Sequence, residues 1–164
     1  MANKISDKYF IKLKDGDNWQ DVTAIFDGIN ILSVSGFSER GEAQNIYTAD
    51  WINSQVEDFM VTTKDEDGND VVVHANVDLT MTFIAGSRYS TNKNVDTQTA
   101  YDNFVDYICN NGDFYIRSLY AGKYAHVTCL KGVKIIDEKL HRGINSYIMA
   151  SATLHTLDVP KKTT

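Results

Sequence analysis

The chain has 164 residues, a length that fits one domain and suffices to bury a sizeable core. Apolar residues make up 43% and charged residues 23%, and the net charge of −6 argues against a protein that grips nucleic-acid phosphates through clustered lysines and arginines. No apolar run is long enough to span a bilayer, and the first ten residues lack the apolar segment of a signal peptide, so we expect no membrane association.

Alternation of apolar and polar residues predicts the first strands. Residues 8–14 place apolar side chains at every second position, which is the period of a half-buried strand. Residues 15–18, Asp-Gly-Asp-Asn, have the chemistry of a turn. Residues 22–26 fit either a short strand or one turn of helix, and residues 29–35 fit another strand.

Residues 36–54 lack a clear period but carry large aromatic side chains, among them Phe37, Tyr47 and Trp51. A loop with such residues often docks on something, because tryptophan and tyrosine lose much when they are left in water. We expect these aromatics either to contact a partner or to fold back over the edge of their own core.

The strongest hairpin signal lies at about 57–86. Residues 59–64 lead to a tip at Asp67-Gly68, which supplies the positive φ that a hairpin turn needs. The return segment, 71–85, alternates apolar and polar residues for longer than the usual strand of about five or six residues. We therefore expect a long β-hairpin that projects beyond the body of the domain.

One segment, at about 97–111, has the pattern of an amphipathic helix. Its apolar residues recur at i, i+3, i+4 and i+7, so they share one stripe of the helix. N-cap oxygens precede the segment, and Asn-Asn-Gly ends it. The stripe that we expect to pack against a sheet consists of Tyr101, Phe104, Val105 and Ile108.

The rest of the chain predicts antiparallel strands. Residues 114–120 and 124–136 form a second expected hairpin, and residues 146–157 form the last strand. Because βαβ units are absent, the expected fold is mainly β: an antiparallel β-sandwich or partial barrel with one flanking α-helix. We expect a single domain over 1–160 and a short disordered tail at 161–164.

The sequence shows no pattern that indicates catalysis, a metal or a cofactor. The acidic tip at 65–70 lacks the first and twelfth ligands of a calcium-binding loop, and the histidines are spread without ligand spacing. Cys109 lies beside the helix stripe and Cys129 lies in a strand-like run, which favours two reduced thiols over a disulfide. We expect a protein that is not an enzyme and that has no cofactor.

Three blocks of sequence stand out together: GFSERGEAQNIYTADWINSQVEDF, VDLTMTFIAGSRY, and TQTAYDNFVDYICNNGDFYIRS with the later ending SYIMASATLHTL. In that order and spacing they resemble the tail tube proteins of tailed phages and prophages, of the kind found in gut Bacteroidota. The resemblance covers most of the chain and rests on pattern, since this family has no catalytic signature. It implies subunits that form rings, usually hexameric, which stack into a tube through which DNA leaves the capsid.

Further implications of the resemblance concern partners and location. The chain would assemble with copies of itself and with other tail proteins, and DNA would pass through without specific binding. It would be made in the host cytoplasm and reside in the virion. The implied contacts to neighbouring subunits and rings are Phe37, Tyr47, Trp51, Asp67 and Gly68.

A polar sheet face without long cations would line the channel, and an ordinary solvent-facing sheet predicts the same alternation. The residues of this face are Asn76, Asp78, Thr80 and Thr82 on one strand and Ser151 and Thr153 on another. Two other interpretations stay open. One is a monomeric ligand-binding barrel or a carbohydrate-binding sandwich that uses Trp19 or Trp51. The other is a distal-tail or baseplate adaptor of the same fold.

Overall fold

The chain forms two compact units, of which the larger carries the main sheet. One unit comprises Met1–Ser38 with Asp78–Thr164, and the other comprises Glu39–Val77. The computed structural model describes residues 7–39, 62–64, 66–72, 76–90, 96–140, 146–158 and 160–163. The single domain expected over 1–160 stays a prediction.

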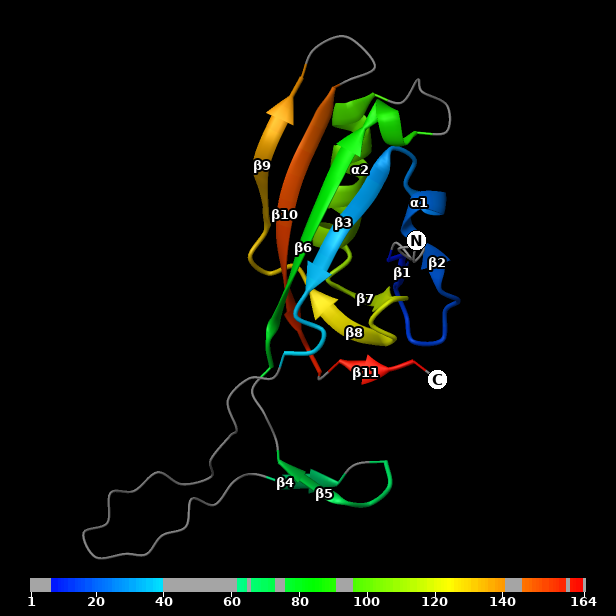
Figure 1. Ribbon diagram of the computed structural model, residues 1–164, viewed down its shortest axis with the longest axis vertical. Helices are drawn as coiled ribbons and strands as arrows, with labels where there is room; N and C mark the ends of the chain where they lie inside the picture. Colours follow the sequence, from blue (N-terminus) through cyan, green and yellow to red (C-terminus); the bar gives the residue numbers. More distant parts are fainter. Residues whose placement is uncertain are drawn as a thin grey trace, which may run out of the picture. The chain divides into compact units, whose positions relative to one another are not determined.

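Strands dominate the larger unit, which also holds one long helix (Figure 1). Its elements are β1 (Tyr9–Lys12), β2 (Gln20–Asp21), α1 (Val22–Ile25), β3 (Ile29–Ser35), β6 (Asp78–Gly86), η1 (Ser87–Tyr89), α2 (Thr97–Asn110), β7 (Asp113–Ser118), β8 (Lys123–Thr128), β9 (Val133–Lys139), β10 (Tyr147–Thr156) and β11 (Lys161–Lys162).

The nine described strands of this unit form one antiparallel sheet in the order β2-β1-β7-β8-β10-β6-β3, with β11 beside β8 and β9 beside β10. β10 pairs with β6 from Tyr147 to His155, but it pairs with β8 only at His155 and Thr156. Figure 1 shows β9, β10, β6 and β3 side by side, with β7 and β8 running across their direction. The sheet is bent and is not closed into a barrel. The predicted fold class, a mainly antiparallel β structure consistent with a sandwich and flanked by one helix, is confirmed.

Helix α2 packs on the core side of β6, β10 and β3. It begins after Asp96, whose Oδ2 accepts hydrogen bonds from the backbone N–H and the hydroxyl of Thr99 at 3.2 and 2.8 Å. Of the predicted stripe, Tyr101, Phe104 and Ile108 are buried, and Val105 is half-buried against the core. The amphipathic pattern therefore places the helix on the inner face of the sheet.

Alternation along β10 and along the first part of β6 builds the centre of the core. The inward side chains of both strands are fully buried: Leu79, Met81, Phe83, Ala85, Ile148, Ala150, Ala152 and Leu154. The Phe83 ring meets the edge of Phe104 from α2 with centroids 4.8 Å apart. Because a strand turns successive side chains to opposite faces, this burial also fixes which residues point outward.

The structure describes only part of the hairpin predicted at about 57–86, since residues 57–61, 65 and 73–75 lie outside the described residues. In the smaller unit, β4 (Thr62–Lys64) pairs with β5 (Asp70–Val72), and a Lys64–Asp70 ion pair of 2.6 Å closes a turn that contains Gly68 at φ +80°. The end of the predicted return segment belongs to the main sheet. Strand β6 begins at Asp78 and pairs with β3 and β10, because its apolar face is part of the main core.

The structure resolves the two interpretations of residues 22–26 and corrects the strand expected over 124–136. Residues 22–26 form a helical turn, α1, capped by Asp21, which accepts from the Thr23 N–H at 2.9 Å. The single strand expected over 124–136 is divided into β8 and β9, and Gly132 at φ +76° lies in the turn between them. A glycine in the left-handed region interrupts a strand, which the apolar pattern alone does not reveal.

The tail differs from the disordered segment that was expected. Lys161 pairs with Tyr124 and Lys162 with Lys123, so β11 extends the sheet beside β8. The Thr163 N–H also donates to the Gly122 carbonyl at 2.8 Å. The edge of β8 offers free backbone groups, and pairing with it satisfies them despite the polar composition of the tail.

Candidate functional site

Small hydroxyl side chains gather on the outer face of the main sheet. The register of β6 and β10 sets Thr80 opposite Thr153 and Thr82 opposite Ser151. These four predicted residues therefore lie together. Thr80 is exposed, and the other three are half-buried among one another. Whether this face lines a channel stays a prediction.

Strand β3 extends the same patch. Ser33 lies opposite Thr82 and Ser35 opposite Thr80, after a register shift in β3 that directly precedes Ser33. The shift keeps the first half of β3 in the core and turns these serines to the outer side. We call this patch the hydroxyl face; it consists of Ser33, Ser35, Thr80, Thr82, Ser151 and Thr153.

A cluster of charged groups bounds one end of the hydroxyl face. The Oδ1 atom of Asp78 lies 2.8 Å from Nδ1 of His155, and its Oδ2 atom lies 2.7 Å from Nζ of Lys131. The contact with the Lys131 ammonium, together with the His155 hydrogen bond, holds the pKa of Asp78 below its ordinary value. The predicted face residue Asp78 is thus an ionised carboxylate whose charge is compensated within the chain.

Strand β9 borders the hydroxyl face on the other side and brings lysines to it. Lys134 lies opposite Ser151. Farther along, the Tyr147 hydroxyl donates to Oδ2 of Asp137 at 2.8 Å, and Lys139 lies opposite Tyr147. The predicted channel face covers β6 and β10 alone and does not include these lysines of β9. The face is small and polar at its centre and of mixed charge at the β9 border.

Both outer strands of this part of the sheet have an unpaired side within the described residues. β3 pairs only with β6, and β9 pairs only with β10. After the half-buried Val133, every side chain of β9 is exposed. Ile135 and Ile136 keep 45% and 56% of their surface accessible to solvent. An exposed edge strand that carries isoleucines is suited to pair with another chain.

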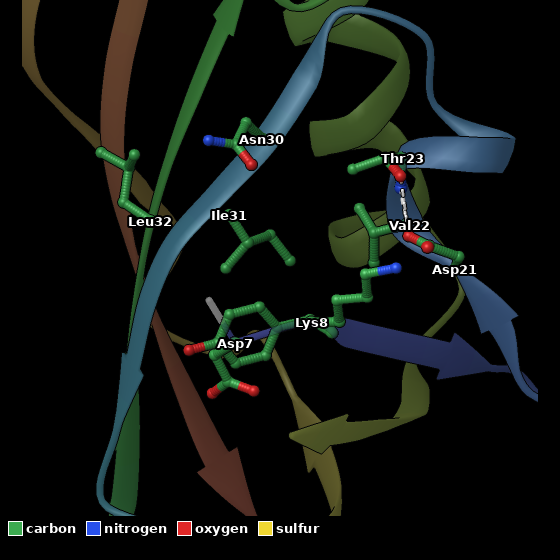
Figure 2. A pocket seen from close by; sticks show the side chains of 9 residues that line it. Asp7, Lys8, Asp21, Val22, Thr23, Asn30, Ile31 and Leu32 are labelled. Atoms are coloured by element: carbon green, nitrogen blue, oxygen red, sulfur yellow. Dashed lines mark hydrogen bonds between the residues drawn. The ribbon is translucent and has the colours of Figure 1, made fainter. Parts of the chain in front are cut away.

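A groove of about 570 Å³ runs beside the free edge of β3. Figure 2 shows β3 on one side of it and β1 and α1 on the other, with Ile31 between them. The groove is lined by residues 7–9, 21–23 and 30–32. At one point the gap is bridged, since the Val34 N–H donates to Oη of Tyr9 at 3.2 Å. Burial, with a hydrogen bond to Asp7, raises the pKa of Tyr9 to about 12, so the hydroxyl stays protonated.

The residues predicted as contacts between subunits fall in different places. Phe37 is buried, at 5% exposure, in the core of its own unit, which favours the alternative that it covers its own domain. Asp67 and Gly68 are exposed at the β4–β5 turn. Tyr47 and Trp51 lie outside the described residues. Asn76, predicted for the channel face, precedes β6 and belongs to the smaller unit.

Aromatic and cationic side chains on β1, β7 and β8 form a second surface feature that sequence reasoning missed. Lys12 Nζ lies 4.6 Å from the ring centroid of Trp19, and Tyr115 stacks on His126 at 4.3 Å. Tyr124 meets Trp19 edge to face at 5.8 Å. The alternation within 115–117 and 124–126 is the signal that points to this face. Lys12 and Tyr124 pack on the half-buried Trp19, and its use in carbohydrate binding stays a prediction.

Among the described residues, no group of three or more His, Cys, Asp or Glu side chains is placed to hold a metal ion. In that same part of the chain, no helix combines the length and the apolar character that crossing a bilayer requires.

Comparison with known proteins gives structural likenesses but no sequence match. No protein-family model and no curated protein matches the chain. Among solved structures, the fold is similar to a chain of the phage p2 baseplate in its activated conformation with Sr, with a TM-score of 0.50 and 13% sequence identity. The match covers 94% of this chain but only 45% of the baseplate chain. At this identity the likeness shows a shared fold.

Proposed function

We propose that this chain is a structural subunit of a phage tail, which joins copies of itself into closed rings that stack into the tail tube. The observation that carries the proposal is the hydroxyl face on a part of the sheet whose two outer strands, β3 and β9, each have one unpaired edge within the described residues. The shared fold with a baseplate chain supports a role in the virion. The host range suggested by the sequence resemblance has no support beyond that resemblance.

The positions of the two outer strands, β3 and β9, support a ring. β3 and β9 bound opposite sides of the same four strands, so one copy can present β9 to β3 of the next. Such a contact joins two different surfaces, and it closes into a ring when the rotation between copies divides a full turn. In the family that the sequence resembles, the rings are usually hexameric.

The exposed side chains of β9 favour an interface over a merely protected edge. Natural edge strands avoid pairing by carrying charges, and β9 has Lys134 and Lys139. However, Ile135 and Ile136 are also exposed, and leaving two large apolar side chains in water is unfavourable unless a partner covers them. The lysines of β9 then determine which strand of a neighbouring copy can pair with it, and Ile135 and Ile136 supply the apolar area that the contact buries.

The hydroxyl face is suited to line the channel of such a ring. Hydroxyl groups at the centre hydrate well and carry no charge, and a chain of net charge −6 repels DNA phosphates. Lys134 lies at the border of this face, near the strand that the next copy would cover. DNA therefore passes the channel without specific binding. The protein acts by assembly and is not an enzyme.

A second candidate function is a baseplate or distal-tail adaptor ring, which the likeness to a baseplate chain favours. Both functions need the same ring, but an adaptor forms a single ring rather than a tube. Electron micrographs of concentrated protein separate the two, because a tube subunit yields stacked rings and an adaptor yields isolated ones.

The test measures assembly of the purified protein by size-exclusion chromatography with light scattering. We expect rings or tubes for the wild type, and their loss when Ile135→Lys and Ile136→Glu place charges on the free strand. Leu119→Lys is the matched control, since Leu119 is 43% exposed and lies outside β3 and β9. A wild type that stays monomeric at high concentration would favour the ligand-binding alternative. Normal assembly by the double variant would exclude β9 from the interface.

A further inference from the structure

Cys109 and Cys129 meet although 20 positions separate them, and their Sγ atoms lie 3.8 Å apart. Cys109 belongs to the last turn of α2, and Cys129 directly follows β8. Both are free thiols, half-buried against the core. A second contact joins the same two regions, because the Thr128 hydroxyl donates to the Gly112 carbonyl at 2.7 Å. The fold therefore fixes two thiols side by side at the base of the helix.

We propose that Cys109 and Cys129 form a redox modification site, at which a low-molecular-weight disulfide such as oxidised glutathione converts the two thiols into an intramolecular disulfide. A disulfide needs a sulfur–sulfur distance of about 2.0 Å, so the two sulfur atoms must approach by less than about 2 Å in total. Rotation about the side-chain bonds of partly exposed residues can supply that movement. Without an oxidant the two cysteines stay reduced, as the sequence predicts.

The reaction balances through two thiol–disulfide exchanges. In the first, the Cys109 thiolate attacks one sulfur of glutathione disulfide, forms a mixed disulfide and releases one glutathione thiolate. In the second, the Cys129 thiolate attacks the Cys109 sulfur, forms the Cys109–Cys129 bond and releases the second glutathione thiolate. The protein loses two electrons and two protons, and glutathione disulfide is reduced to two glutathione molecules.

The environment of Cys129 sets this order. Burial, followed by the charge and hydrogen bond of Cys109, raises the pKa of Cys129 to about 12. A thiol that stays protonated is a poor first nucleophile, so the first attack falls to Cys109. Once Cys109 is in the mixed disulfide, its charge and its hydrogen bond no longer act on Cys129, and the second thiol deprotonates more readily.

The new bond would lock the end of α2 to the segment that leads into β9. It would close a loop that contains β7 and β8, and such a closure stabilises a protein mainly by restricting its unfolded chain. The timing of oxidation rests on the proposed function: a virion subunit stays reduced in the cytoplasm and meets oxidants after release. The crosslink itself is a property of the single chain, so a test on the monomer does not depend on ring assembly.

The experiment treats the full-length protein with oxidised glutathione at pH 8 and measures its intact mass, its free thiols and its melting temperature. We expect the wild type to lose the mass of two hydrogen atoms, to become inert to thiol alkylation, and to melt about 5–10 °C higher than the reduced protein. A reductant should reverse all three changes. Comparing the same wild-type chain in two redox states avoids any folding defect of a variant.

Two single variants test the assigned order. Cys129→Ser should accumulate the mass of one glutathione on Cys109, whereas Cys109→Ser should be modified more slowly, because burial, the largest cause of the raised pKa, still acts on Cys129. Equal glutathione loading of both variants would overturn the order of attack. Two alkylatable thiols in the oxidised and still folded wild type, or crosslinks only between molecules, would overturn the site itself.

Discussion

Thr80 of β6 and Thr153 of β10 lie directly opposite each other on the outer face of the sheet. Their neighbours along the strands, Leu79 and Leu154, are likewise paired, but on the inner face, and both are fully buried. A single register therefore determines the core and the hydroxyl face together. A shift by one residue would exchange the two faces, so the buried leucines hold the threonines in place.

The first prediction concerns the contact between α2 and the sheet. Phe104→Ala should lower the free energy of unfolding by about 3–5 kcal/mol, because Phe104 is 1% exposed and packs edge-on against Phe83 and Phe26. Chemical denaturation measures the loss. Asn103→Ala, an exposed neighbour on the same helix, is the control and should change stability by less than about 0.5 kcal/mol. Equal effects of the two substitutions would show that the helix does not depend on this face.

The second prediction concerns Gly36, which follows β3. Its φ is +111°, and a Cβ atom added there would lie 2.9 Å from Cδ2 of Leu79 and 3.0 Å from the Asp78 carbonyl oxygen. Gly36→Ala should therefore cost about 1–3 kcal/mol in unfolding free energy, from backbone strain and the close contact. The matched substitution Gly16→Ala meets nothing within 4 Å and should be nearly neutral. Thermal melts compare the two, and a neutral Gly36→Ala would contradict the close approach of β3 and β6.

Sequence periodicity predicted those parts of the fold in which the spacing of apolar residues within one element determines its buried face. The stripe of α2 and the alternation of β10 needed only local spacing, and both elements lie where the spacing placed them. The outer position of Thr80 and Thr82 followed from the same alternation. Their alignment with Ser151 and Thr153 was not decided by spacing, since it depends on the register between strands.

The local sequence pattern did not predict which strands pair with each other in the main sheet. The turn chemistry of Asp67-Gly68 predicted a hairpin, and β4 and β5 pair around that turn, but the end of the predicted return segment, residues 78–85, lies in β6 of the main sheet. β6 pairs with β3 and β10 because its apolar side chains are buried in the core there. The local sequence pattern does not reveal which strands pair with each other. The lysines of β9 were missed on the hydroxyl face for the same reason, because β9 reaches it only through its register with β10.

The third prediction concerns acid stability. The pKa of Asp78 is lowered in the folded state by Lys131 and His155, so the ionised carboxylate stabilises the fold above its unfolded pKa of about 3.9. This contribution is lost as the pH falls through the lower folded pKa. Asp78 is about 30% exposed, so solvent screening limits the contribution to about 0.5–1 kcal/mol. Asp78→Asn should therefore melt lower than wild type at pH 6, and the difference should shrink below about pH 4.

Melting temperatures of both proteins between pH 3 and 7 measure this linkage. Glu138→Gln is the control, since it removes one exposed carboxylate from the same sheet without touching the Asp78 cluster. A constant difference between wild type and Asp78→Asn over the whole range would mean that the ion pairs contribute nothing to folding.

The last prediction tests the hydroxyl face as a channel lining. Thr80→Lys and Thr82→Lys together should leave the melting temperature almost unchanged, because both side chains point away from the core. In a ring, every subunit would add two cations to the channel, and each phosphate that they contact adds affinity for DNA. Phage carrying both changes should build tails but eject DNA slowly, and added salt should ease the defect by screening the contacts.

The matched control places the same two charges elsewhere. Gln98→Lys and Asn103→Lys lie on the exposed side of α2 and should not slow ejection. Infectivity and the release of DNA from purified particles measure the outcome. A solvent-facing sheet outside the channel predicts equal behaviour of the two double variants, because their charge is the same and only its position differs. Slow, salt-sensitive ejection confined to the Thr80 and Thr82 variant would place the hydroxyl face along the path of the DNA.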